Sequence, residues 1–429
     1  MTTSRSPLLV LALCWLIVVF DGYDLIVYGT TIPSLLEEPG WDLTPGSAGT
    51  IGSLAFAGML VGALGAGNLS DRVGRRVTII GCVAWFTVFT AACGFATSPE
   101  MFGTLRFLAG LGLGGLVPSA NALASEMVPP RYRSIVATVM MSGVPIGGCI
   151  AALAALTTIP ALGWQALYLY SGLGLVLVAV LVVLLPESPS WLRARARVDE
   201  AVAVESAYGV VYVESGDPAA TARPSIGTVL RAPYLTATLL FAAATIATLF
   251  AWYGLGTWLP KIAGDASLDL GSNPLTYLLA LNLGAVAGSA LTAWAATRIG
   301  PLRSAFGGAV AAALGLAFLL TGPTSAGPVY VALILAGIGT HGTACLLISA
   351  VAEHYPASLR GTALGFSLGA GRVGAVVAPS AAGWLLNAGL GPASSFVLFA
   401  AASGLAALVI AITYVVTRPA TVPAAAPAA

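Results

Sequence analysis

The sequence has few charged residues: Asp, Glu, Lys and Arg together make up 8% of its 429 residues. A soluble globular domain carries roughly 25% charged residues, which keep its surface in water. This chain instead has 58% hydrophobic residues and a mean hydropathy of +0.93. The composition therefore excludes an ordinary soluble protein and predicts that most of the chain lies in lipid.

Residues and motifs that mark other classes of protein are also scarce. The five cysteines are Cys14, Cys82, Cys93, Cys149 and Cys345, and all lie in apolar runs. We interpret them as small buried hydrophobes rather than as disulfides or metal ligands. The sequence contains no metal-ligand spacing and no P-loop. We therefore expect no metal, no cofactor, no ATP-driven transport and no nucleic-acid partner.

Apolar runs long enough to cross a bilayer as helices fill the sequence, since one crossing needs about 20 apolar residues. We predict an all-α membrane protein with twelve transmembrane helices, over residues 8–32, 46–67, 77–96, 101–125, 134–157, 164–185, 234–260, 274–297, 302–321, 328–352, 361–386 and 393–417. Two six-helix halves, 1–185 and 234–417, flank a polar loop at 186–233. The Pro/Ala-rich tail 418–429 is expected to be disordered.

The basic residues sort to one side of this arrangement. Of the 18 Lys and Arg residues, all except Arg106, Arg372 and Lys261 fall on the same side of twelve crossings. The positive-inside rule makes that side cytoplasmic. The opposite connections carry Glu37, Glu38, Asp42, Glu100, Asp265 and Asp269. We therefore expect a multi-pass, monomeric protein of the inner or plasma membrane, surrounded by lipid, with both termini in the cytoplasm.

Two short motifs of the first half recur in the second. The segment SDRVGRR (70–76) is echoed by ATRIGPLR (296–303), and SEMVPPRYR (125–133) is echoed by AEHYPASLR (352–360). The two echoes lie at nearly the same separation along the chain. Two six-helix halves in parallel orientation are a known transporter plan.

These motifs resemble the major facilitator superfamily. GNLSDRVGRR (67–76) resembles its loop signature between helices 2 and 3, and PESPSWL (186–192) resembles the segment that follows helix 6. Within the superfamily, DGYD (21–24), RFLAGLGLGG (106–115) and GAGRVG (369–374) resemble the aromatic acid:proton symporter family. The resemblance implies the fold of that superfamily and proton-coupled uptake of benzoate, a hydroxybenzoate or a similar anion.

Two acidic residues, Asp21 and Asp24, lie near the middle of the first predicted helix. A carboxylate at this depth costs at least about 2.5 kcal/mol on insertion scales. Residues three apart lie on one helical face, and like charges so close raise the pKa of one of them. We predict that this pair couples transport to protons. The alternative is a fixed ion pair with Arg106 or Arg372.

Two basic residues are also expected within membrane spans. Arg372 lies near the middle of its helix, where its planar guanidinium can bind a carboxylate through two hydrogen bonds. Arg106 lies closer to the outer side of its helix. Both are candidates for substrate binding, and for Arg106 pairing with Asp24 is the favoured role. A permanent salt bridge between helices is the alternative for each.

Four further side chains are candidates for contact with the substrate. His341 lies in the middle of its predicted helix and suits a proton relay or a hydrogen bond to the substrate. Trp252, Tyr253 and Trp258 lie in the seventh predicted helix and can stack on an aromatic ring. For all four, ordinary packing inside a helix bundle is the alternative.

The charged loops on the predicted cytoplasmic side form a candidate gate. By resemblance to the superfamily, they build a charge lattice that closes the inner end and breaks when the halves rock. Its members are Asp71, Arg72, Gly74, Arg75, Arg76, Glu126, Arg133, Glu353 and Arg360. The alternative is that these are simple interfacial charges.

Three other functions are alternatives to proton-coupled uptake of an aromatic acid. One is a proton-antiporting efflux pump of the same fold, and another is a symporter of a non-aromatic acid such as shikimate. The third is a membrane sensor without transport, which requires an output domain. An enzyme is not expected, because a nucleophile and its base are missing. The segments GLGLGG (110–115), GIGTHG (337–342) and GFSLG (365–369) match enzyme motifs but lie within predicted membrane helices.

Overall fold

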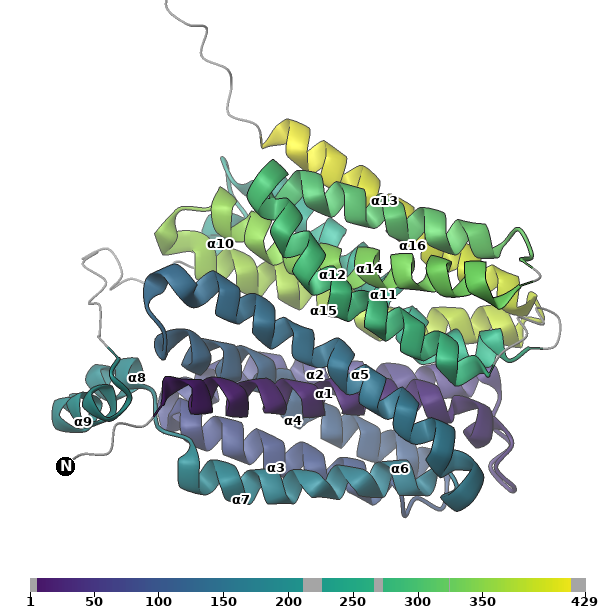
Figure 1. Cartoon of the computed structure of the whole chain (residues 1–429), viewed down its shortest axis with the longest axis horizontal. Helices are drawn as coiled ribbons and strands as arrows, with labels where there is room; N and C mark the ends of the chain where they lie inside the picture. The colour runs from purple at the N-terminus through teal and green to yellow at the C-terminus, as the bar shows by residue number, and fades with distance from the viewer. Residues whose placement is uncertain (1–5, 211–225, 266–272, 324, 418–429) are drawn as a thin grey trace, which may run out of the picture.

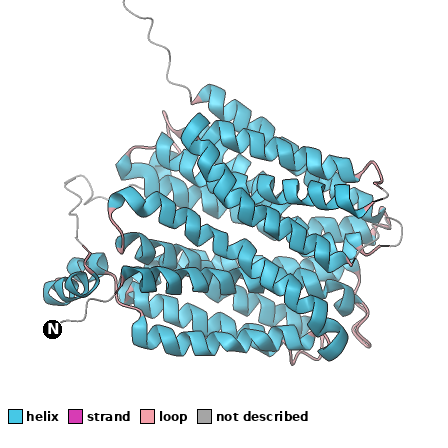
Figure 2. Cartoon of the chain, viewed as in Figure 1, coloured by secondary structure: helices cyan, strands magenta, loops and turns pink. Residues whose placement is uncertain are grey.

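The structure, a computed structural model, describes residues 6–210, 226–265, 273–323 and 325–417. These residues form helices and loops, with no strand among them (Figure 2). Twelve of the described helical segments are long and apolar enough to cross a membrane. The predicted all-α, twelve-helix fold is therefore confirmed. The tail at 418–429, which was expected to be disordered, lies outside the described residues.

The first six spans are α1 Pro7–Leu36, α2 Pro45–Val73, α3 Arg75–Cys93, α4 Pro99–Glu126, α5 Arg133–Leu162, and a sixth made of α6 Gln165–Tyr170, η2 Ser171–Leu173 and α7 Gly174–Leu184. The last six are α11 Leu235–Ala263, α12 Pro274–Ile299, α13 Pro301–Leu319, α14 Ala326–His354, α15 Ala357–Asn387 and α16 Gly391–Val416. Between and beside them are η1 Pro130–Tyr132, α8 Pro189–Ala194, α9 Val198–Tyr208 and α10 Ile226–Val229. Most ends agree with the predicted spans to within a few residues.

Polar residues followed by proline start several of these helices. The side chains of Ser6, Thr44, Ser98 and Asn273 each accept a hydrogen bond from a backbone N–H in the first turn of the helix that follows. Each of those helices has proline in its first positions, where the missing N–H costs nothing. Local sequence therefore fixes where these spans begin.

The two echoed loop motifs form the same tight junction. Gly74 joins α2 to α3 with a φ of 101°, and Gly300 joins α12 to α13 with a φ of 86°. Both values lie in the region that favours glycine. Each glycine ends one helix and starts the next, so the chain reverses direction within a single residue.

The helices lie side by side, with α1–α7 on one side of the molecule and α11–α16 on the other (Figure 1). The short helices α8 and α9 extend beyond one end of the bundle. We call this the basic end, because it carries Arg72, Arg75, Arg131, Arg195 and Arg360. We call the opposite end the acidic end, because it carries Glu37, Glu38, Asp42, Glu100 and Asp265.

The buried apolar residues show where the halves are joined. One cluster, which includes Trp41, Trp164, Trp258 and Phe396, draws residues from both halves and lies toward the acidic end. The two other clusters lie toward the basic end. One belongs to the first half, apart from Tyr208 of the loop 186–233 and Ala375, and the other belongs to the second half, apart from Val229 of the same loop. The halves therefore share a core near the acidic end and have separate cores near the basic end.

Candidate functional site

We call the surface along which the two halves meet the seam. Near the acidic end, the helices on either side of the seam are in close contact. A Cβ at Gly29 of α1 would collide with the Gly256 carbonyl of α11, and a Cβ at Gly49 of α2 would collide with the Pro379 carbonyl of α15. The hydroxyls of Ser53 and Ser380 lie 2.7 Å apart across the same seam. Small residues let the helix backbones approach this closely. At these contacts the helices therefore leave no room for a solute to pass between the halves.

Helices α2 and α15, which touch in the acidic part of the seam, are separated in its basic part. Gly361, Gly365 and Gly369 repeat along one face of α15, and no heavy atom lies within 4 Å of where their Cβ atoms would be. Gly65 and Gly67 of α2 are equally uncovered. The structure is therefore closed between the halves at the acidic end and apart at the basic end.

Two opposite charges from different halves lie within electrostatic range of each other at the centre of the seam. Asp21 is the middle of α1 and Arg372 is the middle of α15, so they come from different halves. The Asp21 side chain is buried, and its Oδ1 has no hydrogen-bond partner. The charges that act most on Asp21 are those of Arg372 and Asp24. Arg372 is half-buried and forms no ion pair shorter than 4 Å with the described residues.

Aromatic side chains lie beside this central pair. Tyr253 of α11 is within electrostatic range of both Arg372 and Asp21. Its ring lies 4.7 Å from that of Phe56 of α2, centroid to centroid, which places an aromatic pair across the seam. The centre of the seam therefore combines a cation, a carboxylate and flat apolar surface.

His341 and Trp252 form a neighbouring cluster. Their ring centroids lie 5.1 Å apart, and His341 Nε2 lies 3.8 Å from Cys345 Sγ. His341 also interacts with the backbone of Met141 of α5, in the opposite half. Both rings are buried and come from the middle portions of α14 and α11.

Trp258 lies apart from these aromatic residues, in the sealed acidic part of the seam. Its Nε1 donates a hydrogen bond of 2.8 Å to the Pro379 carbonyl. Its ring also lies against Gly383, which in turn packs on Pro45 of the other half. The structure therefore gives Trp258 a contact in the seal, two turns beyond Trp252 along α11.

Asp24 and Arg106 pair inside the first half. Arg106 Nη1 donates to both carboxylate oxygens of Asp24, at 2.9 and 3.0 Å, and Nη2 donates to the Asp24 backbone carbonyl at 3.2 Å. Thr90 of α3 donates to the same carboxylate at 2.5 Å, and Arg106 lies 5.8 Å from the centre of the Tyr28 ring. Asp24 and Arg106 are each 1% exposed, so this pair is closed off from both ends.

The candidate gate residues of the first half bind the loop that follows α7. Arg75 forms an ion pair with Glu126, and Ser188 Oγ donates to Glu126 Oε2 at 2.6 Å. Glu187 Oε1 accepts from the backbone N–H groups of Arg75 and Arg76, at 2.9 and 3.1 Å. Gly74 packs directly against this carboxylate.

The remaining gate candidates make contacts within their own half. Arg195 of the loop donates to the backbone carbonyls of Asp71 and Arg72, both at 3.0 Å. Arg133 donates to the Ser125 carbonyl at 3.2 Å, and Arg360 donates to the Tyr355 carbonyl at 3.1 Å, while Glu353 is exposed. Among the described residues, no ion pair joins the two halves at the basic end.

The structure adds residues that sequence analysis did not single out. Phe56 packs on Tyr253 beside the central pair, Cys345 contacts His341 in the neighbouring cluster, and Thr90 donates to Asp24 of the Asp24–Arg106 pair. Nothing in an apolar run marks such residues in advance. Glu187 lies in the quoted segment PESPSWL, where an acid next to prolines was a usable signal. Within the described ranges, no group of three His, Cys, Asp or Glu residues is placed to hold a metal ion.

Comparison with known proteins assigns the chain to a family. The sequence matches the Major Facilitator Superfamily over residues 14–366 and again over residues 277–429. It is 47% identical to the gentisate transporter of Corynebacterium glutamicum, over 94% of this chain and 88% of that protein. It is 35% identical to the benzoate transport protein of Acinetobacter baylyi, over 88% and 83% of the two chains. It is 32% identical to the 4-hydroxybenzoate transporter PcaK of Pseudomonas aeruginosa, over 89% and 86%.

Solved structures with a similar fold include the xylose transporter XylE of E. coli in its partially occluded inward-open conformation. The TM-score is 0.73 and the identity 16%, over 94% of this chain and 96% of that one. The inward-open conformation of XylE gives a TM-score of 0.72 at 15% identity, over 94% and 95% of the two chains. At this identity the likeness establishes the fold. The chain is therefore a multi-pass membrane transporter, not an enzyme, and it belongs to the aromatic acid transporter family of the major facilitator superfamily.

Proposed function

We propose that this transporter takes up a small aromatic carboxylate together with a proton, with gentisate as the first candidate substrate. The observation that carries the proposal is the central pair of Asp21 and Arg372, which come from opposite halves and lie within electrostatic range of each other and of Tyr253, whose ring packs on Phe56. The printed names of the gentisate, benzoate and 4-hydroxybenzoate transporters that this chain resembles support the substrate class.

The substrate carboxylate binds Arg372, whose guanidinium matches it through two parallel hydrogen bonds. The ring lies against Tyr253 and Phe56, whose flat faces give it apolar contact. His341 and Trp252 form the adjoining wall and are placed to contact ring substituents. Trp258 lies in the acidic-end seal, so its share in the transport cycle is to close the path.

The need to keep the net charge of the central site constant couples binding of the anion to binding of a proton. In the empty site, Arg372 and Asp21 sum to zero charge. Binding a carboxylate adds one negative charge at membrane depth, which is costly to move through a low-dielectric centre. A proton on the Asp21 carboxylate restores the sum to zero. The loaded and empty sites then carry the same net charge, and the proton leaves with the substrate after the halves rock.

The pair formed by Asp24 and Arg106 remains fixed while Asp21 changes its proton. Its hydrogen bonds lie within the first half, so rocking of the halves has no need to break them. Asp24 then supplies a constant negative neighbour that influences Asp21. This assigns the moving proton to Asp21 and a positioning role to Asp24.

Alternating access follows from the two ends of the seam. The two bodies are residues 1–185 and 234–417, linked by the loop 186–233. Because positive residues favour the cytoplasm, the basic end faces inward, both termini lie inside, and the described state is inward-facing. Closing the basic end brings the gate residues on α2, α4, α14 and α15 together. One chain supplies the whole path, so a monomer in the inner or plasma membrane suffices.

Uptake into proteoliposomes tests this function. We expect an inwardly directed proton gradient to drive accumulation of labelled gentisate, and a protonophore to abolish it. Benzoate and 4-hydroxybenzoate are expected to compete, and shikimate is not. Accumulation that rises when the protonophore is added indicates the efflux pump instead. Absence of uptake for every acid tested, with correctly inserted protein, contradicts the proposal.

A further inference from the structure

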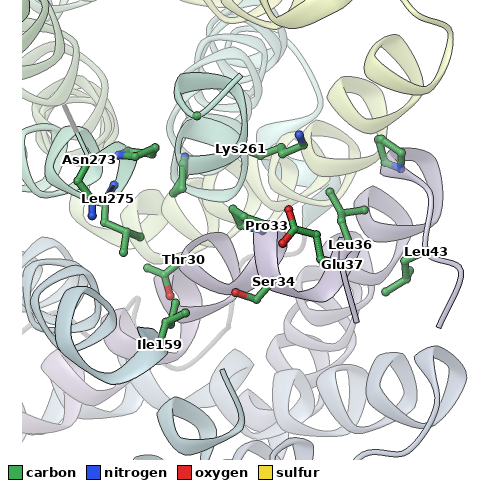
Figure 3. A pocket seen from close by; sticks show the side chains of 14 residues that line it. Thr30, Pro33, Ser34, Leu36, Glu37, Leu43, Ile159, Lys261, Asn273 and Leu275 are labelled. Carbon is green, nitrogen blue, oxygen red and sulfur yellow. Dashed lines mark hydrogen bonds between the residues drawn. The ribbon is translucent and has the colours of Figure 1, made fainter. Parts of the chain in front are cut away.

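A cavity of about 530 Å³ lies at the acidic end, apart from the central site. It is formed by the last turns of α1, α5 and α11 and by the starts of α2 and α12, so both halves contribute to it (Figure 3). Its volume is in the range of about 300–1,000 Å³ that is typical of small-molecule sites. The cavity is therefore large enough for an aromatic acid.

The cavity is separated from the centre of the seam in this state. Thr30 of α1 lines it, and the next residue toward the centre is Gly29, which packs on the Gly256 backbone of α11. Pro260, one turn beyond Gly256, lines the same wall. A solute in the cavity therefore lies on the acidic-end side of this contact, while the two halves are separated at the basic end.

One basic residue faces this cavity in an acidic environment. Lys261 is the only lysine of the chain, and it lies at the end that carries Glu37, Glu38, Glu100 and other acidic residues. No ion pair involves Lys261 among the described residues. An anion approaching the acidic end meets repulsion over most of the rim and attraction at Lys261.

The remaining wall suits a flat, partly polar molecule. Pro33, Pro45, Pro260 and Pro274 give it rigid apolar faces, while the carboxylate of Glu37 supplies an acceptor from the opposite half to Lys261. Figure 3 shows Glu37, Lys261 and the apolar side chains around one hollow. A carboxylate placed near Glu37 is repelled, so the two charges together fix the orientation of a bound acid.

We propose that this cavity is a capture subsite that holds the aromatic carboxylate before the acidic end opens. The carboxylate binds the Lys261 ammonium, the ring lies between the prolines, and a ring hydroxyl donates a hydrogen bond to Glu37. This rests on the proposed function, because it assumes an aromatic acid as substrate. A subsite above the seal lets the next substrate be held while the previous one leaves at the basic end.

The test compares transport from the two sides in oriented vesicles. Lys261→Gln is expected to raise the KM for gentisate entering from the acidic end by about fivefold, with Vmax unchanged. The KM for gentisate entering from the basic end stays as in the wild type. Lys261→Arg retains the charge and is expected to keep the wild-type KM, which shows that the position tolerates substitution.

Two further variants separate a specific contact from the net charge of the rim. Glu100→Gln removes a rim charge outside the cavity, and the double variant Lys261→Gln/Glu100→Gln restores the original net charge. The double variant is expected to keep the raised KM. Glu37→Gln is expected to reduce the preference for gentisate over benzoate, because Glu37 accepts from a ring hydroxyl.

The following outcomes contradict the proposed capture subsite. A wild-type KM in Lys261→Gln removes it, and so does a full return to the wild-type KM in the double variant. A KM that rises equally from both sides places the effect of Lys261 on the central site or on the equilibrium between states. If the wild-type protein transports no aromatic acid, the proposed function has failed, which is a result distinct from these.

Discussion

Arg106 and Arg372 are both arginines at membrane depth, yet their surroundings differ. Arg106 donates three hydrogen bonds to Asp24 and is 1% exposed inside the first half. Arg372 is half-buried at the seam, where a carboxylate approaches it from the other half without a close ion pair. A buried charge is tolerated either because it has a fixed ion-pair partner, as Arg106 has although its Nε is unpaired, or because its partner arrives during function.

Arg106 therefore has a structural role, whereas Arg372 is the cation that we propose binds the substrate. Because all three hydrogen bonds of Arg106 end on Asp24, they stabilise the packing of α1 on α4. Arg372 keeps donors available for an anion from outside. The same contrast holds between the acids, since Asp24 has its oxygens satisfied and the Oδ1 atom of Asp21 has no partner.

The largest expected effect on transport follows removal of the Arg372 guanidinium. In Arg372→Ala, gentisate uptake is expected to fall at least about 100-fold, because a charge-assisted, two-point contact with the substrate is lost. Arg372→Lys keeps the charge but not the planar fork and is expected to recover only a small part of the rate. Initial uptake rates at matched protein levels measure both. Wild-type uptake in Arg372→Ala contradicts a substrate contact.

Breaking the structural pair is expected to affect stability before transport. Asp24→Asn or Arg106→Met leaves a buried charge unpaired, at a cost of about 3–5 kcal/mol in the free energy of unfolding. The double variant Asp24→Asn/Arg106→Met removes both charges and is expected to recover much of the lost thermal stability. Melting of the purified protein in detergent measures this. Asp21→Asn serves as the matched control, with a smaller shift in Tm than Asp24→Asn.

The two ends of the α2–α15 seam are expected to respond oppositely to a larger side chain. Gly49→Val puts a side chain into the sealed acidic part, whereas Gly365→Val puts one where no atom lies within 4 Å in this state. We expect the first to favour opening at the acidic end and the second to block closure at the basic end. Each lowers transport by about tenfold by depleting one state. Thiol labelling of cysteines placed at the two ends reports the shift, and equal labelling in both variants contradicts it.

The smallest expected effect concerns the charge lattice of the basic end. Glu126 pairs with Arg75 and accepts from Ser188, all on the first half and its following loop. Partly exposed ion pairs contribute little, so Glu126→Gln is expected to lower Vmax about twofold to fivefold. Substrate KM stays unchanged, because the residue is far from Arg372. A rise in KM with normal Vmax contradicts a gating role.

The fold was predictable because lipid imposes one requirement on every span. Apolar runs of about 20 residues have to be helices, and the distribution of arginines supports the count of twelve. Helix ends were less predictable. α1 continues to Leu36 through Pro33, and α5 continues to Leu162 through Pro160, where turns beyond the expected ends 32 and 157 stay helical.

The site was predictable only in part. Ionisable residues within spans stood out, because burying charge is costly, and this singled out Asp21, Asp24, Arg106 and Arg372. Which acid meets which arginine depends on the rotation of α1 about its own axis. Two residues three apart share a face only approximately, and here that offset directs Asp24 to Arg106 and Asp21 toward Arg372. No pattern in a single sequence fixes that rotation.

The most direct test of the coupling compares exchange with accumulation in Asp21→Asn. The neutral amide imitates the protonated acid, so Arg372 and a bound carboxylate still sum to zero and the loaded carrier still moves. The empty variant retains the uncompensated charge of Arg372 and returns poorly. We expect exchange of labelled for unlabelled gentisate to persist while accumulation driven by a proton gradient is lost. Wild-type accumulation in Asp21→Asn contradicts the assignment of the proton to this residue.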